Sequence, residues 1–172
     1  MGNIGRRVAR ILNGFGASLL YYDPRPLDPE QEKALGCRRV DVDEIFAQSD
    51  ILTLHLPLME QTRGFVNAQR LAAMKPEAIF INTARAQLVV EEDLAQALRL
   101  KKLAGAGLDE LCTSPEQSPL IGLDNVICTP HIGGSTLDIN DEMARVCIEH
   151  ILTVRRGEKL VPPALVNGEE LK

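Results

Sequence analysis

The chain alternates short apolar runs with segments in which apolar residues recur every three or four positions. The first pattern predicts strands, and the second predicts amphipathic helices. Strands are expected at residues 19–22, 51–55, 78–82, 104–108 and 126–128. Helices are expected at residues 3–15, 42–48, 68–74, 92–100 and 137–155. Apolar strands that alternate with helices indicate an α/β fold, in which a doubly wound parallel sheet carries helices on both faces.

A glycine pattern precedes the first predicted helix. Gly2 and Gly5 fill the second and third glycine positions of the pattern G-x-G-x-x-G, with Asn3 and Ile4 between them. Backbone N–H groups and the positive end of the helix dipole bind a pyrophosphate in such a loop. The alternative is a glycine-containing turn that caps an ordinary helix. The first glycine and its preceding strand have no counterpart in the sequence, so we expect a Rossmann-type sheet that lacks its first strand.

An acid ends the next predicted strand. Asp23 follows Gly5 at close to the spacing of about 20 residues expected for a ribose-binding carboxylate. A carboxylate there accepts hydrogen bonds from the ribose hydroxyls and repels a 2′-phosphate, which favours NAD over NADP. Arg25 argues against this preference for NAD, because a guanidinium can bind the 2′-phosphate of NADP. An acid in an ordinary strand-ending turn is the plainer alternative.

Composition narrows the class of protein. The 172 residues are 45% hydrophobic, which is typical of one globular domain, and the net charge of −5 argues against a nucleic-acid surface. No apolar run approaches the length of a membrane span, and the N-terminus lacks a secretory apolar stretch, so we expect a cytoplasmic protein that does not bind membranes. The four cysteines have no paired spacing, which predicts no metal site.

Polar residues follow the predicted strands at their carboxyl ends, where open parallel sheets bind ligands. Any one of them is often only a turn former, but together they form one rim. They are His55, Pro57, Thr83, Arg85, Asp109 and His131.

These residues lie in motifs that resemble the D-isomer-specific 2-hydroxyacid dehydrogenases, with the phosphoglycerate dehydrogenase and glyoxylate/hydroxypyruvate reductase branches most similar. The motifs are the N-terminal glycine loop, Tyr22-Asp23-Pro24, His55-Leu56-Pro57-Leu58, Thr62-Arg63-Gly64, Asn82-Thr83-Ala84-Arg85, residues 103–109, and Thr129-Pro130-His131-Ile132-Gly133-Gly134-Ser135-Thr136. The resemblance implies a Rossmann NAD-binding domain over residues 1–160, and a return segment over residues 161–172 toward a substrate domain. It also implies hydride transfer between NAD(H) and a 2-hydroxy or 2-oxo acid, and a homodimer.

The resemblance assigns roles by position. Arg85 matches the arginine that binds the substrate carboxylate, and a planar guanidinium suits that task because it engages two oxygens. His131 matches the acid/base histidine. Asp109 matches an acid that binds the nicotinamide carboxamide. The implied cofactor-binding residues are Gly2, Asn3, Ile4, Gly5, Asp23, His55, Pro57, Thr62, Thr83, Ala84, Asp109, Gly133 and Gly134.

One departure concerns the acid/base pair. The family places a glutamate where this chain has Ser114, and that carboxylate would orient His131 and favour its protonated form. Glu116 is the substitute that the sequence suggests. Ser114 and the lacking strand leave a second function open, namely a non-catalytic dinucleotide-binding or dimerisation module. A formate- or phosphite-type dehydrogenase is a third reading, because those enzymes share the scaffold.

Overall fold

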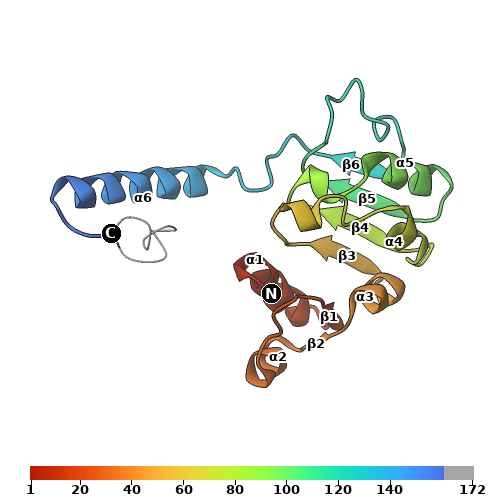
Figure 1. Cartoon of the computed structure of the whole chain (residues 1–172), viewed down its shortest axis with the longest axis horizontal. Helices are drawn as coiled ribbons and strands as arrows, with labels where there is room; N and C mark the ends of the chain where they lie inside the picture. Colours follow the sequence, from red (N-terminus) through yellow and green to blue (C-terminus); the bar gives the residue numbers. More distant parts are fainter. Residues whose placement is uncertain (161–172) are drawn as a thin grey trace. The chain divides into compact units, whose positions relative to one another are not determined.

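The computed structural model describes residues 1–160, which belong to two compact units (Figure 1). The first unit, Met1–Gly133, contains all the described strands, and the second begins at Gly134 and contains helix α6 (Leu137–Arg155). The predicted return segment at residues 161–172 lies outside the described residues, and the domain boundary at residue 160 stays a prediction. No described helix is both long enough and apolar enough to cross a membrane.

The N-terminal half of the first unit is a small α/β layer. Its elements are α1 (Asn3–Gly14), β1 (Leu19–Tyr21), α2 (Pro29–Leu35) and β2 (Cys37–Arg39). The two strands pair in parallel, with Leu19 opposite Cys37. The Asp28 carboxylate caps α2 by accepting a hydrogen bond from the Gln31 N–H, and Gly36 ends the helix at a φ of 62°. The sequence analysis missed both α2 and β2.

The second half is a four-stranded parallel sheet in the order β3-β4-β5-β6. Its elements are α3 (Val42–Gln48), β3 (Ile51–Leu54), η1 (Glu60–Thr62), α4 (Ala68–Ala72), β4 (Ile79–Asn82), η2 (Ala86–Leu88), α5 (Glu91–Arg99), β5 (Gly105–Leu108) and β6 (Val126–Cys128). The predicted parallel α/β class is therefore confirmed, and all five predicted strands are present with ends within one residue of the predicted ends.

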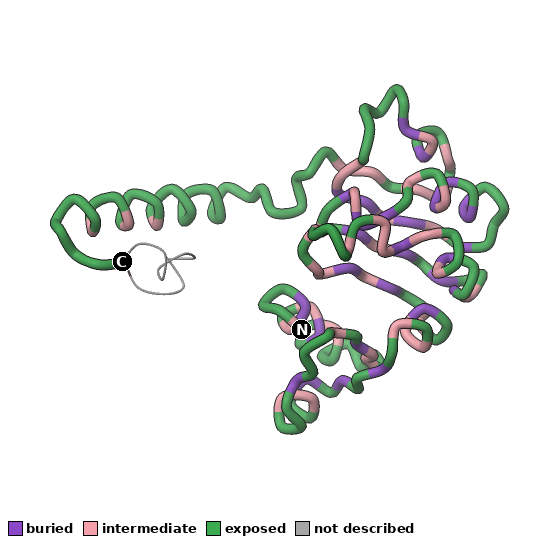
Figure 2. Tube along the Cα trace, in the orientation of Figure 1, coloured by how far each residue is buried: buried purple, intermediate pink, exposed green. Residues whose placement is uncertain are grey.

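The two faces of this sheet differ in burial. Alternate residues such as Leu52 and Phe80 are buried in a hydrophobic cluster that includes Phe46 of α3, Leu71 of α4 and Leu94 of α5. On the opposite face Ile51, Ile79 and Ile127 are 60%, 40% and 73% exposed. The predicted class, a doubly wound parallel α/β fold, is confirmed, and in Met1–Gly133 many of the buried residues lie along the strands and helices of this half (Figure 2).

The two sheets share no strand pairing among the described residues. β1 has β2 as its sheet neighbour, and β3 has β4. In a doubly wound sheet of order 3-2-1-4-5-6, one strand lies between the equivalents of β1 and β3. The interruption therefore falls where the sequence predicts that the first strand is lacking.

Candidate cofactor and substrate site

A cavity of about 790 Å³ lies beside α1, β1 and β3. Glycines, an acid and polar loop residues line its part near the carboxyl ends of the strands. The predicted cofactor-binding residues among them are Gly2, Gly5, Asp23, His55, Pro57 and Thr62. The structure therefore brings six of the predicted residues together around one space.

The N-terminus of α1 is suited to an anionic group. No side chain caps this helix, and its first turn contains no acid. A Cβ at Gly2 would meet nothing within 4 Å, so space remains in front of the helix. A Cβ at Gly5 would lie 3.2 Å from the Met1 Sδ and 3.8 Å from the His55 Cβ, so Gly5 lies close to both side chains. Asn3 and Ile4 form the first helical residues, where backbone N–H groups point out of the helix end.

Asp23 lies just beyond the end of β1. One of its oxygens accepts a hydrogen bond from the Arg25 N–H at 2.8 Å, and the other pairs with the amino terminus of Met1. Burial raises the pKa of Asp23, but the hydrogen bonds from the amino terminus and Arg25 outweigh burial and lower the pKa overall. The carboxylate is therefore ionised at neutral pH, as a ribose-binding acid must be.

The loop after β3 is held by local bonds. The Thr62 hydroxyl donates to the Pro57 carbonyl at 2.8 Å and accepts from the Met59 N–H at 2.8 Å. The His55 Nε2 lies 3.2 Å from the Thr53 hydroxyl, and burial lowers the pKa of His55. A neutral His55 fits the wall of a cofactor pocket better than a role as a charged group.

Arg85 follows β4 on a turn that Asn82 fixes. The buried Asn82 amide donates to the Arg85 carbonyl at 2.8 Å, and its oxygen accepts from the Ala84 N–H at 3.0 Å. The guanidinium is exposed and contacts the Ala84 carbonyl at 2.6 Å. Thr83 is exposed on the same turn. The turn thus presents a cationic group at the sheet edge where ligands bind.

Asp109 organises the loop that carries His131. Its carboxylate accepts hydrogen bonds from the Thr129 hydroxyl at 2.6 Å, the Ile132 N–H at 2.9 Å and the Gly133 N–H at 2.8 Å. The bond from Thr129 is the largest of the effects that lower the pKa of Asp109. A Cβ at Gly133 would lie 2.7 Å from the carboxylate, so a side chain here would displace the carboxylate from the loop N–H groups that it binds. The nicotinamide contact predicted for Asp109 stays a prediction, while its bonds to this loop are a role that the sequence did not reveal.

His131 itself adopts a φ of 56°, a conformation that few residues other than glycine take up. Its N–H donates to the Asp109 carbonyl at 2.6 Å, so the same acid holds the loop through both backbone and side chain. The imidazole is 55% exposed and faces solvent at the sheet edge. This placement leaves the ring accessible to a substrate.

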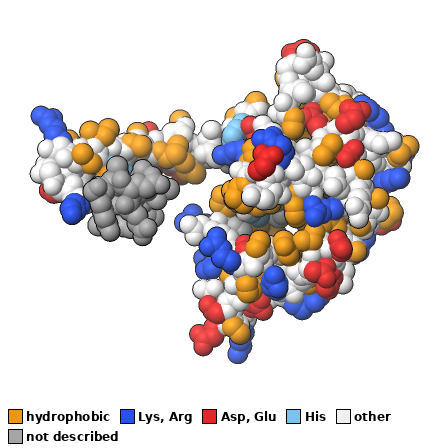
Figure 3. Space-filling view, viewed as in Figure 1, with side chains coloured by type: hydrophobic (Ala, Val, Ile, Leu, Met, Phe, Trp, Pro, Cys, Tyr) orange, Lys and Arg blue, Asp and Glu red, His pale blue; other side chains and the backbone are white. Residues whose placement is uncertain are grey.

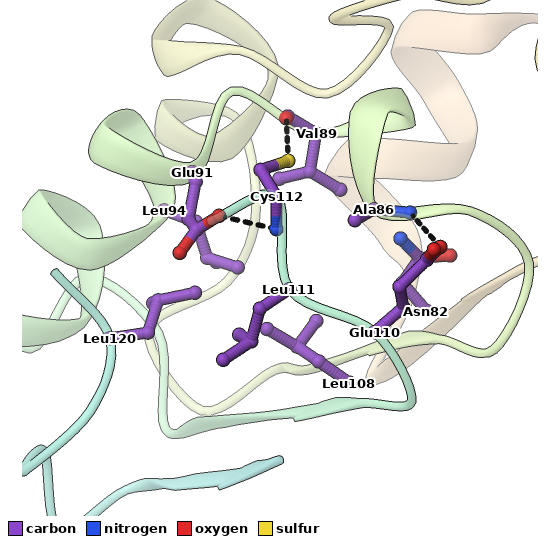
Figure 4. Close-up of a pocket in the computed structure, with 10 residues that line it drawn as sticks. All are labelled: Asn82, Ala86, Val89, Glu91, Leu94, Leu108, Glu110, Leu111, Cys112 and Leu120. Carbon is purple, nitrogen blue, oxygen red and sulfur yellow. Dashed lines mark hydrogen bonds between the residues drawn. The ribbon is translucent and has the colours of Figure 1, made fainter. Parts of the chain in front are cut away.

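Glu110 is the residue that sequence reasoning missed. Its Oε1 lies 3.8 Å from the His131 Nδ1, and its Oε2 accepts a hydrogen bond from the Ala86 N–H at 3.0 Å. Figure 4 shows the carboxylate directed at Ala86, beside Asn82. Glu110 therefore links the turn of Arg85 to the ring of His131. Glu110 follows the rim residue Asp109 in the sequence, but its contact with His131 arises only when the loop after β6 returns to β5.

The predicted substitute for the family glutamate lies elsewhere. Ser114 and Glu116 are both exposed, and among the described contacts neither reaches His131. The Glu116 carboxyl has a pKa below its ordinary value because its own N–H and Ser114 donate to it. Gly134, which is among the predicted cofactor-binding residues, is the first residue of the second unit. The role proposed for Glu116 stays a prediction, and the structure offers Glu110 as a nearer carboxylate.

A second cavity lies behind Glu110 but has a volume of only about 10 Å³ (Figure 4). Its lining includes Glu91, which accepts a hydrogen bond from the Cys112 N–H at 2.8 Å. Burial, followed by the charge of Glu91, raises the pKa of the Cys112 thiol to about 11. A space of this size holds at most one water molecule, so it is not a substrate site.

The uncapped helix, the glycines and the ionised Asp23 fit a dinucleotide, so the first unit has the features of a dinucleotide-binding domain. The family described as D-isomer specific 2-hydroxyacid dehydrogenase, NAD binding domain, matches residues 1–133. The chain belongs to this family, and NAD is the cofactor that the family's domain binds.

Relatives cover nearly the whole chain. A glyoxylate reductase of Thermococcus onnurineus is 42% identical over 171 residues, which are 99% of this chain and 50% of that protein. The NAD complex of a D-isomer specific 2-hydroxyacid dehydrogenase from Lactobacillus delbrueckii superposes with a TM-score of 0.86 at 32% identity, covering 96% of this chain and 53% of that one. The apo D-mandelate dehydrogenase of Rhodotorula graminis superposes with a TM-score of 0.83 at 37% identity, covering 89% of this chain and 45% of that one. The chain thus spans about half the length of these relatives.

Proposed function

We propose that the chain forms the cofactor-binding half of an NAD(H)-dependent dehydrogenase that interconverts 2-oxo and 2-hydroxy acids. One observation carries this proposal. Glu110 contacts both the turn that presents Arg85 and the ring of His131, so a cation and an acid/base group lie on neighbouring loops at one sheet edge. A 2-oxo acid needs both groups, a cation for its carboxylate and a proton donor for its carbonyl oxygen. The names of the relatives support glyoxylate as the first substrate to test.

Each residue has a chemical task in this proposal. Arg85 binds the substrate carboxylate and orients the carbonyl. NADH, when bound, supplies the hydride to the carbonyl carbon. His131 as imidazolium gives its proton to the carbonyl oxygen, and neutral His131 takes that proton back in the oxidative direction. Glu110 positions the ring, because its Oε1 lies 3.8 Å from the His131 Nδ1 while its Oε2 accepts a hydrogen bond from the Ala86 N–H.

Cofactor binding is the first test, and it uses the chain itself. Fluorescence titration with NADH and NADPH is expected to show a preference for NADH, because the ionised Asp23 repels a 2′-phosphate. Asp23→Asn should reduce that preference, whereas Asp43→Asn, an exposed acid on α3, should not. Tighter binding of NADPH by the unaltered chain would show that Arg25 controls the choice instead.

Catalysis is tested in a chimera in which this chain replaces the matching half of the Thermococcus onnurineus glyoxylate reductase. Arg85→Ala and His131→Asn should each lower the rate of NADH oxidation by glyoxylate by about 10²–10⁴-fold, the usual contribution of such groups. Arg10→Ala and His150→Asn change exposed or half-buried positions on α1 and α6 and serve as controls. Full activity of Arg85→Ala and His131→Asn would contradict the proposal.

The carboxylate partner of His131 has its own test in the same chimera. Glu110→Gln should lower the rate of NADH oxidation by glyoxylate, because it weakens the contact that holds the ring of His131 beside the turn of Arg85. Glu116→Gln is the matched control and should leave the rate unchanged. The opposite result would restore Glu116 as the partner.

We also propose a cytoplasmic homodimer. The exposed isoleucines Ile51, Ile79 and Ile127 on the open face of the β3–β6 sheet support self-association, because apolar residues grouped on one surface favour burial against a partner. Light scattering should report twice the chain mass at micromolar concentration. Ile127→Lys should give a monomer, and a monomer without that change would contradict this part of the proposal.

A further inference from the structure

The segment that follows Asp109 lies against the connection between β4 and α5, as Figure 4 shows. At the start of this segment, the Glu110 Oε2 accepts a hydrogen bond from the Ala86 N–H at 3.0 Å. Two residues later, the Cys112 N–H donates to the Oε2 of Glu91, the first residue of α5, at 2.8 Å. The segment from Glu110 to Cys112 is therefore fixed to the same connection at both of its ends.

The Glu91 carboxylate has a second bond to the same loop. Its Oε1 accepts a hydrogen bond from the Ser118 hydroxyl, and Ser118 is buried although its sequence neighbours are polar. Residues 113–117, which lie between Cys112 and Ser118, are all exposed. One carboxylate thus holds the loop on both sides of its exposed part.

Glu91 differs in this respect from the acid beside it. Figure 3 shows acidic side chains scattered over the surface of the larger part of the molecule, which is the ordinary place for a glutamate. Glu92 is of this kind, because its side chain is 74% exposed and pairs with Arg99 at 4.0 Å. Both acids lie in the first turn of α5, where a negative charge interacts favourably with the helix dipole. The dipole alone does not explain why both Glu91 oxygens bind the loop.

From these bonds we propose that Glu91 is a positioning residue that sets the place of the Glu110 carboxylate and, through it, of the His131 ring. The described hydrogen bonds of Glu91 reach neither Arg85 nor His131, so its effect passes through the loop. Glu110 completes the path, because its Oε1 lies 3.8 Å from the His131 Nδ1. The inference rests on the proposed function, in which His131 transfers the proton. Its test follows the ring and not turnover, so either idea can fail without the other.

The test uses the whole chain without ligand and records the histidine ring resonances by NMR at constant pH. Glu91→Ala should shift the resonances of His131 and leave those of His55 and His150, which lie after β3 and on α6, unchanged. It should also accelerate hydrogen exchange of the Ala86 amide by about tenfold, the effect of losing one hydrogen bond to a charged group. An unshifted His131 ring beside a faster Cys112 amide would overturn the proposal, because Glu91 would then act only on its own contacts.

Glu91→Gln and Glu92→Ala are the matched variants. A glutamine has an acceptor for the Cys112 N–H and a donor for the Ser118 hydroxyl, so Glu91→Gln should keep the His131 resonances of the unaltered chain. Glu92→Ala removes an acid from the same helix end and should also leave them in place. A shift in Glu91→Gln as large as in Glu91→Ala would refute the proposal, because charge and not the two bonds would then act on the ring. An equal shift in Glu92→Ala would refute it in favour of the helix dipole.

The path through Glu110 is tested by combining variants. In a chain that already carries Glu110→Gln, the addition of Glu91→Ala should cause no further shift of His131, because two residues that act through one contact are not additive. A further shift as large as in the unaltered chain would mean that Glu91 reaches the ring by another path, contrary to the proposal.

Glu91→Asp decides the matter if Glu91→Ala fails to fold. It keeps the negative charge at the start of α5, but its shorter side chain cannot keep both loop bonds in their present geometry. The His131 resonances should therefore shift in this variant, and Ala86 should exchange faster than in the unaltered chain. A folded Glu91→Asp chain in which both stay unchanged would overturn the positioning role.

Discussion

The two halves of the first unit differ in how much core they bury. The β3–β6 half contains a large cluster in which Phe46, Phe80, Leu94 and Leu98 are at most 1% exposed. The β1–β2 half has five buried members, namely Ala9, Tyr21, Leu27, Leu35 and Cys37. An isolated two-stranded ribbon is marginal in water, so the smaller half depends on the larger one. The residues suited to the adenosine end of a cofactor thus lie on the less stable half, and those suited to catalysis lie on the more stable half.

Among the variants that test this difference between the two halves, Phe80→Ala should have the largest effect on the free energy of unfolding. Phe80 is fully buried at the centre of the four-stranded sheet, and truncation leaves a cavity that costs about 3–5 kcal/mol of the free energy of unfolding. Urea unfolding followed by hydrogen exchange should show that both halves lose protection. If β1 and β2 kept their protection, the smaller half would be an independent folding unit.

Asp109→Asn acts within the stable half. The carboxylate accepts three hydrogen bonds from the loop of His131, and an asparagine places an N–H donor against at least one of these donors. The expected loss is about 1.5–3 kcal/mol, the range for bonds to a charged group. Exchange should accelerate in residues 129–133, while β3 and β4 retain their protection. A uniform loss across the sheet would mean that Asp109 supports the core and not only this loop.

Tyr21→Phe tests the weaker half. The Tyr21 hydroxyl donates to Glu32 at 2.7 Å and accepts from the buried Leu27 N–H at 2.9 Å. Removing it leaves that N–H without a partner and should cost about 1–1.5 kcal/mol. We expect faster exchange in β1 and β2 and unchanged exchange in β4 and β5. Tyr22→Phe, at an exposed neighbouring position, is the control and should have no such effect.

The same contrast explains what the sequence predicted. The strands of the β3–β6 half are continuous apolar runs, which the hydrophobic pattern detects. β2 contains the exposed Arg38 and Arg39, so it has no apolar pattern. α2 is short, and its signals were the cap Asp28, the following Pro29 and the terminal Gly36 rather than a periodic stripe. The pattern of apolar residues detects elements that bury a face, and it misses those that a cap and a turn define.

The site shows a similar division. Rim positions such as Arg85, Asp109 and His131 follow recognisable strands, so the sequence indicates their common edge. Glu110 was missed because its contact with His131 depends on how the loop after β6 returns to β5, which no local pattern encodes. Leu120 shows the same limit. Residues 113–124 have the composition of a surface loop, yet Leu120 is 1% exposed and belongs to the large core cluster.

The smallest expected effect concerns the pH dependence of stability. The pKa values of Asp23 and Asp109 are both lowered in the folded chain, so each carboxylate stabilises the fold above its unfolded pKa of about 3.9. That stabilisation is lost as the pH falls through the lowered folded values. Asp23 is partly exposed and lies in the weaker half, so Asp23→Asn should flatten the fall in melting temperature between about pH 5 and pH 2 only slightly. Asp109→Asn should flatten it more, and Asp124→Asn, at an exposed position, should leave it unchanged. A larger effect of Asp23→Asn than of Asp109→Asn would show that the β1–β2 half controls acid unfolding through the ion pair between Asp23 and Met1. The order of stability of the two halves would then be the reverse of the one expected here.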